Sequence, residues 1–345
     1  MIKSLNMSTE FSFIILTFNE EQHLPRLLHS IAGLNAETFI LDSGSTDRTL
    51  DIAREYHIPT TYNAFTNHPE QWNAALHIFP VKTPWVICLD ADQLVTRELF
   101  EKLERFKNEA HLEINGIYFN RKNIFKGKWL KHGGYYPKFL LKMFRYNLGY
   151  SDLNENMDHK FQVPGKTIIW RTGHLIEENL KENSISFWIE KHNRYSDLLA
   201  TEEVERIQLQ RQQSLKPQFW GSPNERNAWL KRLWWQLPRY IRPLLYFSYR
   251  MIFQRGFLDG KTGIIFHFLQ GFWFRLIVDM KIDEKLTHLK KSKNPTEQIN
   301  EKKEYSYLRF AAVFPMLFFI FYFFNLAVIG ITNPDGYYNS FFETP

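Results

Sequence analysis

Residues 85–92 read Trp-Val-Ile-Cys-Leu-Asp-Ala-Asp, an apolar run that ends in two carboxylates. A short run of this kind predicts a buried strand. Asp90 and Asp92 leave the strand at positions i and i+2, so both can turn toward one hard divalent cation, and oxygen ligands are those that Mg²⁺ and Mn²⁺ prefer. Because such a pair is also common in solvated turns, the neighbouring segments decide whether it forms a metal site.

Upstream of this run, apolar segments alternate with helical patterns. In chain order, the expected strands and helices are Phe11–Phe18, Glu20–Leu34, Phe39–Asp42, Thr46–Tyr56, Thr60–Ala64 and Glu70–Phe79. The alternation predicts an α/β fold with a parallel sheet and helices on its faces. Asp42, Asp90 and Asp92 follow strand runs, so we expect them at the carboxyl edge of the sheet, where ligands of open α/β sheets bind. There the Asp42 carboxylate could accept a hydrogen bond from the imide of a uracil ring.

Downstream of Asp92 the pattern changes. Residues 111–180 carry glycines among aromatic and basic segments, which indicates an antiparallel extension and loops that complete a pocket. A helix is expected over Ser184–Leu209. Two basic, aromatic, amphipathic segments follow, Trp229–Phe253 and Gly263–Met280, and helices of this type often lie in a membrane interface.

The most hydrophobic stretch lies near the C-terminal end. Residues 310–331 read FAAVFPMLFFIFYFFNLAVIGI, and at about 1.5 Å per residue a helix of this length crosses a ~30 Å hydrocarbon layer. Pro315 and Asn325 leave a kinked, half-inserted or partner-packed helix open as alternatives. Lysines and Arg309 precede the stretch and Asp335 follows it, so the positive-inside rule leaves the large N-terminal part in the cytoplasm.

Composition narrows the class of protein. Of 345 residues, 44% are apolar and 23% are charged, which excludes collagen-like, low-complexity and mostly disordered chains. Aromatic residues reach 17%, as expected where part of the surface is shared with lipid headgroups. Cys88 is the single cysteine, which favours a reducing compartment, and no secretory signal is visible at the start. The net charge of +6 arises from basic residues dispersed among acids, so nucleic-acid binding is not expected.

Several motifs together resemble the family 2 inverting glycosyltransferases of the GT-A fold. They are IILTFNEE at 14–21, LDSGSTDRT at 41–49, QWNAAL at 71–76, LDADQ at 89–93, YYPK at 135–138, KMFR at 142–145, ENMDH at 155–159 and WIEKHNRY at 188–195. Within the family, the chain most resembles bacterial enzymes that add sugars to lipid-linked precursors of lipopolysaccharide core, capsule or exopolysaccharide. The resemblance implies a Rossmann-like, mostly parallel central sheet with helices on both faces.

The resemblance also implies roles in binding a nucleotide-sugar donor, most simply a UDP-sugar. Thr17 and Glu20 would line the pocket for base and ribose, and Asp42 would pair with the base. Asn73 would lie near the phosphates or sugar of the donor, and Asp90 would contact the ribose or the donor sugar.

A divalent cation, Mg²⁺ or Mn²⁺, is implied at Asp92. His159 would complete the coordination of the cation or orient the base. Gln93 stands where many relatives have glutamate, and we expect this difference to tune the site without abolishing it. Residues 65–69, Phe-Thr-Asn-His-Pro, depart from the usual Trp-x-Gly form of the family, so no contact with the donor sugar is assigned to them.

An inverting transfer needs one base that removes the proton of the acceptor hydroxyl. Asp158 and Glu155 are the candidates, and Asp158 is favoured because relatives place a carboxylate next to a histidine at this point. Among the basic residues, Lys138, Lys142 and Arg145 could hold the phosphates of the acceptor or the donor, and we expect no more than one of them to do so. Arg145 suits bidentate contact and is assigned to the donor.

These interpretations divide the chain into five parts. They are a GT-A catalytic domain at residues 1–215, membrane-interface amphipathic helices at 216–289, a basic linker at 290–309, a transmembrane helix at 310–331 and a short tail at 332–345. The predicted protein is an inverting, metal-dependent glycosyltransferase that acts on a polyprenyl-linked saccharide. It would sit at the cytoplasmic face of a bacterial inner membrane, held by a single C-terminal span. Two alternatives stay open: a membrane-tethered scaffold that binds nucleotide-sugar without turnover, and a nucleotidyltransferase.

Overall fold

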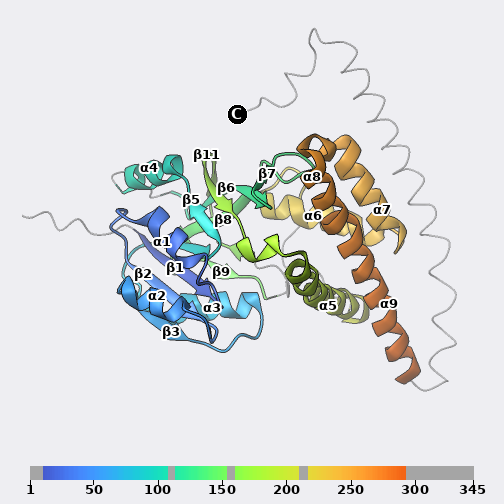
Figure 1. Ribbon diagram of the computed structural model, residues 1–345, viewed down its shortest axis with the longest axis horizontal. Helices are drawn as coiled ribbons and strands as arrows, with labels where there is room; N and C mark the ends of the chain where they lie inside the picture. The colour runs from blue at the N-terminus through green and yellow to red at the C-terminus, as the bar shows by residue number, and fades with distance from the viewer. Residues whose placement is uncertain (1–10, 108–112, 154–159, 210–216, 293–345) are drawn as a thin grey trace, which may run out of the picture.

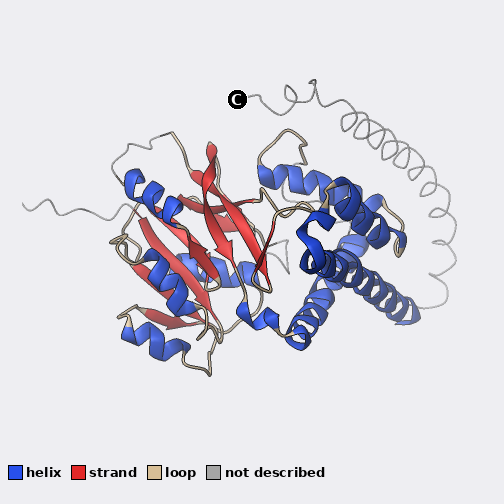
Figure 2. Cartoon of the chain, turned by 45° about the horizontal axis from the view of Figure 1, so that its top comes forward, coloured by secondary structure: helices blue, strands red, loops and turns tan. Residues whose placement is uncertain are grey.

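A computed structural model describes residues 11–107, 113–153, 160–209 and 217–292 of the chain. The described strands gather in one part of the molecule, and the helices that follow them form the other part (Figure 2). The C-terminal stretch 310–331, for which a transmembrane helix is expected, lies outside the described residues.

The main sheet has nine strands, in the order β3-β2-β1-β4-β8-β6-β11-β5, with β7 paired to β6 (Figure 1). These strands are β1 (Phe11–Thr17), β2 (Thr38–Asp42), β3 (Thr60–Tyr62), β4 (Trp85–Asp90), β5 (Gln93–Val95), β6 (Gly116–Phe125), β7 (Lys128–Leu130), β8 (Phe139–Arg145) and β11 (Thr167–Glu177). A second, two-stranded sheet joins β9 (Tyr150–Ser151) and β10 (Phe161–Gln162).

The first half of the main sheet is parallel, since β1 pairs in parallel with both β2 and β4, and β2 with β3. Beyond β4, strand β8 runs antiparallel to both β4 and β6, so the sheet is mixed. The alternating pattern of the first part of the chain and the antiparallel extension after it are thereby confirmed. The α/β class is confirmed with them.

Helices cover both faces of the sheet. They are α1 (Leu24–Ile31), α2 (Thr49–Glu55), α3 (His68–Ile78) and α4 (Arg97–Phe106). Alternate residues of β1 separate the two faces, because side chains along a strand point to opposite sides. Phe13 and Ile15 belong to the core formed with α1, α2 and α4, whereas Ile14 packs against Trp72 and Leu76 of α3. Because β1 is packed on both faces, its carboxyl end is held in a fixed position.

The remaining helical elements follow β11 in the chain. They are η1 (Leu180–Asn183), α5 (Ile185–Leu209), α6 (Pro223–Gln236), α7 (Ile241–Ser248), η2 (Tyr249–Phe253), η3 (Gly256–Asp259), α8 (Gly260–His267), η4 (Phe268–Trp273) and α9 (Phe274–Ser292). Leu199 and Ala200 of α5 pack against Phe274 and Val278 of α9 in a separate apolar core. The amphipathic segment expected over Trp229–Phe253 is two helices rather than one, because the chain leaves the helical conformation at Leu237, directly before a proline.

One helix within the described part of the chain, Gly256–Leu289, is long and apolar enough to cross a membrane by length and composition alone. Of its most apolar window, 39% is buried inside the protein. This helix overlaps the segment Gly263–Met280, which the sequence predicts to be interfacial.

Candidate active site

The carboxyl ends of β1, β2 and β4 lie side by side at one edge of the sheet. Thr17 is in register with Asp42 and Leu16 with Asp90, because β1 pairs in parallel with the strands on either side of it. Asp92 follows two residues after Asp90. The structure therefore brings three of the predicted carboxylates to the same edge, as expected for consecutive strand ends of a parallel sheet.

Asp42 is buried, and both of its carboxylate oxygens accept hydrogen bonds. Thr17 Oγ1 and Ser45 Oγ donate to Oδ2 at 2.7 and 2.6 Å. The backbone N–H groups of Gly44 and Ser45 donate to Oδ1, both at 2.8 Å. Asp42 thus orders the turn after β2, and a uracil imide that donates to this carboxylate must share it with these four donors.

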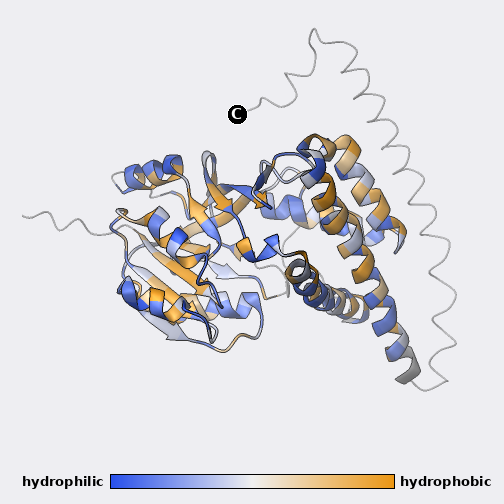
Figure 3. Cartoon of the chain, viewed as in Figure 1, coloured by the Kyte–Doolittle hydropathy of each residue, from blue (hydrophilic) through white to orange (hydrophobic). Residues whose placement is uncertain are grey.

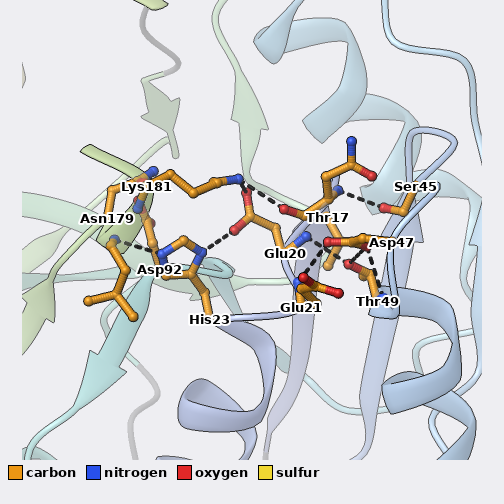
Figure 4. A network of polar contacts seen from close by, with 12 residues as sticks. Thr17, Glu20, Glu21, His23, Ser45, Asp47, Thr49, Asp92, Asn179 and Lys181 are labelled. Carbon is orange, nitrogen blue, oxygen red and sulfur yellow. Dashed lines mark hydrogen bonds and ion pairs between the residues drawn. The ribbon is translucent and has the colours of Figure 1, made fainter. Parts of the chain in front are cut away.

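The loop after β1 is held against the loop after β2 by hydrogen bonds (Figure 4). Asn19, which has a left-handed backbone with φ 55°, donates its N–H to Ser45 Oγ at 2.8 Å. Its side-chain oxygen accepts from the Thr46 N–H at 2.7 Å. The Glu20 N–H donates to Thr49 Oγ1, also at 2.7 Å. Two loops that are expected to contact the nucleotide are thereby joined into one unit.

The Glu20 carboxylate connects this unit to η1, the turn that follows β11 (Figure 4). Lys181 Nζ lies 2.8 Å from Glu20 Oε1 and also donates to the carbonyl of Asn19 at 3.0 Å. His23 is fully buried, and its Nε2 accepts from the Leu180 N–H at 2.8 Å. Its proton must therefore be on Nδ1, which donates to Glu20 Oε2 at 2.5 Å.

Asp90 lies beside a buried cation. Lys142 Nζ is 2.8 Å from Asp90 Oδ2, and the Lys142 side chain is almost completely enclosed. Gln93 is also buried: its side-chain oxygen accepts from the Asp90 N–H at 3.2 Å, and its Nε2 donates to Glu177 Oε2 at 2.9 Å. The glutamine thus connects the end of β4 to the end of β11.

Asp92 is half-buried among other acids. Burial, together with the nearby carboxylates of Glu177 and Asp90, raises the pKa of Asp92 to about 8. Asn179 Nδ2 donates to Asp92 Oδ2 at 3.3 Å. The pKa of Lys191 is raised although burial opposes this, because Tyr195, Glu182 and Asp92 favour its charged form. The positive charge near Asp92 is therefore too small to balance the carboxylates around it.

This donor set fits a divalent cation bound together with a diphosphate. Among the described residues, no group of three or more histidine, cysteine or acidic side chains is arranged to hold a metal ion by itself. Mg²⁺ is usually held by one or two carboxylates plus substrate phosphates, so Asp90 and Asp92 would suffice with a diphosphate present. A cation there would also relieve the repulsion that raises the pKa of Asp92.

Arg145 does not join the other predicted donor-binding residues. Because β8 is antiparallel to β4, Arg145 is paired with Trp85, the first residue of β4. That position is roughly 16 Å along the strand from Asp90, at about 3.3 Å per residue. The guanidinium instead stacks over the Trp85 ring at 4.5 Å. The prediction for Arg145 is corrected on this ground, and Lys142 is the basic residue of this strand that reaches the site.

Asn73 lies on α3 and binds backbone. Its Nδ2 donates to the Ser151 carbonyl at 2.9 Å, and its Oδ1 accepts from the Ser151 N–H at 2.8 Å. Its predicted contact with the donor stays a prediction. The candidate bases Asp158 and Glu155 and the candidate ligand His159 lie outside the described residues.

Five residues that surround the predicted site residues were not predicted from the sequence. They are His23, Glu177, Asn179, Lys181 and Lys191. A signal for three of them, Glu177, Asn179 and Lys181, existed, since residues 177–181 read Glu-Glu-Asn-Leu-Lys directly after an apolar strand pattern. No local pattern marks His23, because its partner Leu180 is 157 residues away.

One family model and several known proteins match the chain. Residues 12–167 match the family model described as Glycosyl transferase family 2. The chain is similar to the lipopolysaccharide core biosynthesis glycosyltransferase LpsC of Rhizobium meliloti (strain 1021), with 26% identity over 276 residues, 75% of this chain and 89% of that protein. It is also similar to an uncharacterized glycosyltransferase of Rickettsia bellii (strain RML369-C), with 28% identity over 98 residues, 28% of this chain and 33% of that protein.

Two solved structures are also similar. One is S. aureus TarS 1-349 in complex with UDP-GlcNAc, with a TM-score of 0.36 and 14% identity, covering 81% of this chain and 92% of that chain. The other is glucosyl-3-phosphoglycerate synthase from Mycobacterium tuberculosis in complex with Mn²⁺ and UDP-Glc, with a TM-score of 0.27 and 21% identity, covering 35% of this chain and 45% of that chain.

Proposed function

Since residues 12–167 belong to glycosyl transferase family 2, we propose that this glycosyltransferase moves a sugar from a UDP-sugar to a lipid-linked saccharide, with inversion at the anomeric carbon. The product would enter the synthesis of a cell-surface polysaccharide. The similarity to a lipopolysaccharide core enzyme over 75% of the chain supports this class of acceptor.

The observation that carries the proposal is the crowding of carboxylates at the ends of the parallel strands. The pKa of Asp92 is raised by burial of its carboxyl group and by the nearby carboxylates of Glu177, Asp90 and Glu20. A protein does not gain stability from such crowding, so a ligand with positive charge is expected there. A divalent cation that neutralises a diphosphate meets this requirement.

The donor would be held by the loops after β1 and β2 and by the end of β4. We assign the base and ribose to Thr17, Glu20 and Asp42, and the ribose or donor sugar to Asp90. Mg²⁺ or Mn²⁺ held by Asp92, with Asp90 beside it and His159 as a further candidate ligand, would stabilise the charge on the leaving diphosphate. The hydrogen bonds between the two loops mean that little ordering would remain to be done when the nucleotide binds.

The reaction assigned to this site is a single displacement. The acceptor hydroxyl oxygen attacks the anomeric carbon on the side opposite the diphosphate, the new glycosidic bond forms, and the bond to the diphosphate oxygen breaks. The hydroxyl proton passes to a carboxylate, for which Asp158 is the first candidate and Glu155 the second. Both follow Ser151, whose backbone Asn73 holds in place.

The proposed setting is the cytoplasmic face of a bacterial inner membrane. A single C-terminal span at residues 310–331 would hold the catalytic domain near its lipid-linked acceptor. The basic residues that precede this stretch in the sequence favour that orientation.

A transfer assay with the full chain tests the proposal. The protein is incubated with a panel of radiolabelled UDP-sugars, Mn²⁺ and polyprenyl-diphosphate-linked saccharide, and both UDP and label in the lipid fraction are measured. We expect UDP and lipid-bound label in equal amounts. The variant Asp92→Asn should lose both products, whereas Asp51→Asn, a change of an exposed aspartate on α2, should keep them.

The same assay separates the alternatives. Donor binding without UDP or labelled lipid from any sugar would indicate a scaffold and contradict the proposal. Release of sugar 1-phosphate in place of UDP, with the nucleoside monophosphate joined to the acceptor, would indicate nucleotidyl transfer and would contradict it as well.

A further inference from the structure

The helical part of the molecule presents an apolar surface that nothing in the described chain covers. Six large apolar side chains of α7, η2, η3, α8 and η4 are between 43% and 54% exposed. We call this set the apolar tip; it consists of Leu244, Ile252, Phe257, Leu258, Ile264 and Phe268. The rings of Phe247 and Phe268 lie 6.0 Å apart, which places α7 beside η4. Figure 3 shows apolar residues along α7 and α8 at the outer side of this part of the molecule.

The exposed charges on the chain segment that carries the apolar tip have one sign. Between Ile241 and Val278, the chain has a single carboxylate, Asp259, which is buried. Asp259 accepts hydrogen bonds from the backbone N–H and Nδ1 of His132, at 2.9 and 2.7 Å. The exposed charged residues of the same stretch are Arg255 and Lys261. Formal charge at this surface is therefore positive.

The β6–β7 turn extends this positive rim. Lys126 and Lys128 are exposed on either side of Gly127. A Cβ placed on Gly260 would lie only 3.2 Å from Lys128 Nζ, so the turn is in contact with the start of α8. Exposed apolar side chains with cations beside them complement a bilayer that contains anionic lipids.

The helix Gly256–Leu289 does not span a membrane, because the residues of its second half are packed against other parts of the protein. Phe274, Val278 and Ile282 are buried against α5. Asp279 is also buried and is paired with Arg242. These side chains already have protein partners, and such buried polar contacts would be lost in lipid. Among the described residues of this helix, the end that belongs to the apolar tip is therefore the part that can enter a membrane.

We propose that the apolar tip inserts into the interfacial layer of a bilayer rich in anionic phospholipid, with the basic rim on the headgroups. In this arrangement the segment Ile252–Phe268 lies in the plane of the membrane. It attaches the protein to the bilayer in addition to any membrane-spanning segment. This inference deepens the proposed function and takes its membrane setting from it. Because His132 connects the tip to the loop before β8, docking would set the orientation of the catalytic sheet toward the membrane.

The test uses fluorescent labels on the full chain. Cys88 is fully buried, so a cysteine introduced at the surface is the reactive one among the described residues. Phe257→Cys and Ile264→Cys place an environment-sensitive nitrobenzoxadiazole label in the apolar tip. Ile78→Cys on α3 is the matched control, with 46% exposure against 50% for Phe257 and 43% for Ile264. Circular dichroism and thermal unfolding check that each variant folds.

In vesicles of phosphatidylethanolamine and phosphatidylglycerol, both tip labels should shift to shorter emission wavelengths. Lipids with a nitroxide near the headgroup should quench them, and the label at position 78 should show neither effect. Combining Arg255→Gln with Lys261→Gln removes two cations worth about 1 kcal/mol each at an anionic surface, so quenching of the label at position 264 should fall by more than about twofold.

Two results would overturn the inference. In the first, tip labels on vesicle-bound protein stay as exposed to water as the control label. In the second, the tip labels are shielded without lipid while light scattering shows a dimer, so that a second copy covers the surface. The measurement involves neither donor nor acceptor, so its failure is distinct from a failure of sugar transfer.

Discussion

Replacing Lys181 by methionine tests the network that joins the nucleotide loops to the turn after β11. Methionine keeps much of the apolar length of lysine but cannot donate, so the contacts to Glu20 Oε1 at 2.8 Å and to the Asn19 carbonyl at 3.0 Å are lost. Hydrogen bonds to charged groups contribute about 1.5–3 kcal/mol. If the loop must be reordered when UDP binds, this loss raises the Kd for UDP by roughly 10- to 100-fold, since about 1.4 kcal/mol is a factor of ten.

Calorimetric titration of the full chain with UDP in the presence of Mn²⁺ measures this effect. Lys281→Met is the matched control: Lys281 is 16% exposed against 22% for Lys181, and its Nζ donates to Asn193 and Asp197 on α5. We expect an unchanged Kd for the control. A folded Lys181→Met protein whose Kd stays within about twofold of the wild type would show that the network does not order the nucleotide loops, and would contradict this prediction.

Three further predictions concern ionisable groups that the fold removes wholly or partly from water. Arg242→Met leaves Asp279 without its buried cation and should lower the free energy of unfolding by about 3–5 kcal/mol in urea titrations, whereas Arg239→Met at a more exposed pair should cost at most about 1 kcal/mol. Burial lowers the pKa of His267 to about 4, below its ordinary 6.5. The contribution of the neutral ring to the free energy of unfolding is therefore complete above pH 6.5 and is lost as the pH falls toward 4. His267→Gln should therefore remove up to about 3 kcal/mol of the acid-side decrease in stability; an unchanged pH profile would contradict this. The pKa of Asp92 is raised from 3.8 to about 8. Without metal, the contribution of Asp92 to the free energy of unfolding is therefore fully present below pH 3.8 and is lost as the pH rises to 8. In EDTA, Asp92→Asn should raise the Tm at pH 8, and it should abolish the increase in Tm that Mn²⁺ gives the wild type; a lower Tm in EDTA would count against the account.

The parallel part of the fold could be predicted because its signals are local. Short apolar runs and helical patterns alternate up to Asp90, and each can be recognised within a few residues. The common edge of Asp42, Asp90 and Asp92 then follows from the rule that parallel strands end together. The register of β1 with β2 and β4 confirms that edge.

Contacts that depend on distant pairing could not be predicted. Arg145 is predicted at the donor site because arginine suits bidentate contact with phosphate, but the antiparallel pairing of β8 takes it to the far end of β4. His23 meets Leu180 across 157 residues, and Lys181 meets Glu20 across 161. No periodicity in either segment carries this information, since it arises only when β11 returns to the sheet.

A crystal structure of the full chain with UDP and Mn²⁺, with anomalous data collected at the manganese edge, tests the central assignment most directly. We expect one manganese peak between the Asp92 carboxylate and the diphosphate, with the uracil ring beside Thr17 and Asp42. UDP bound away from the ends of β1, β2 and β4, or manganese bound without any contact from Asp90 or Asp92, would contradict it.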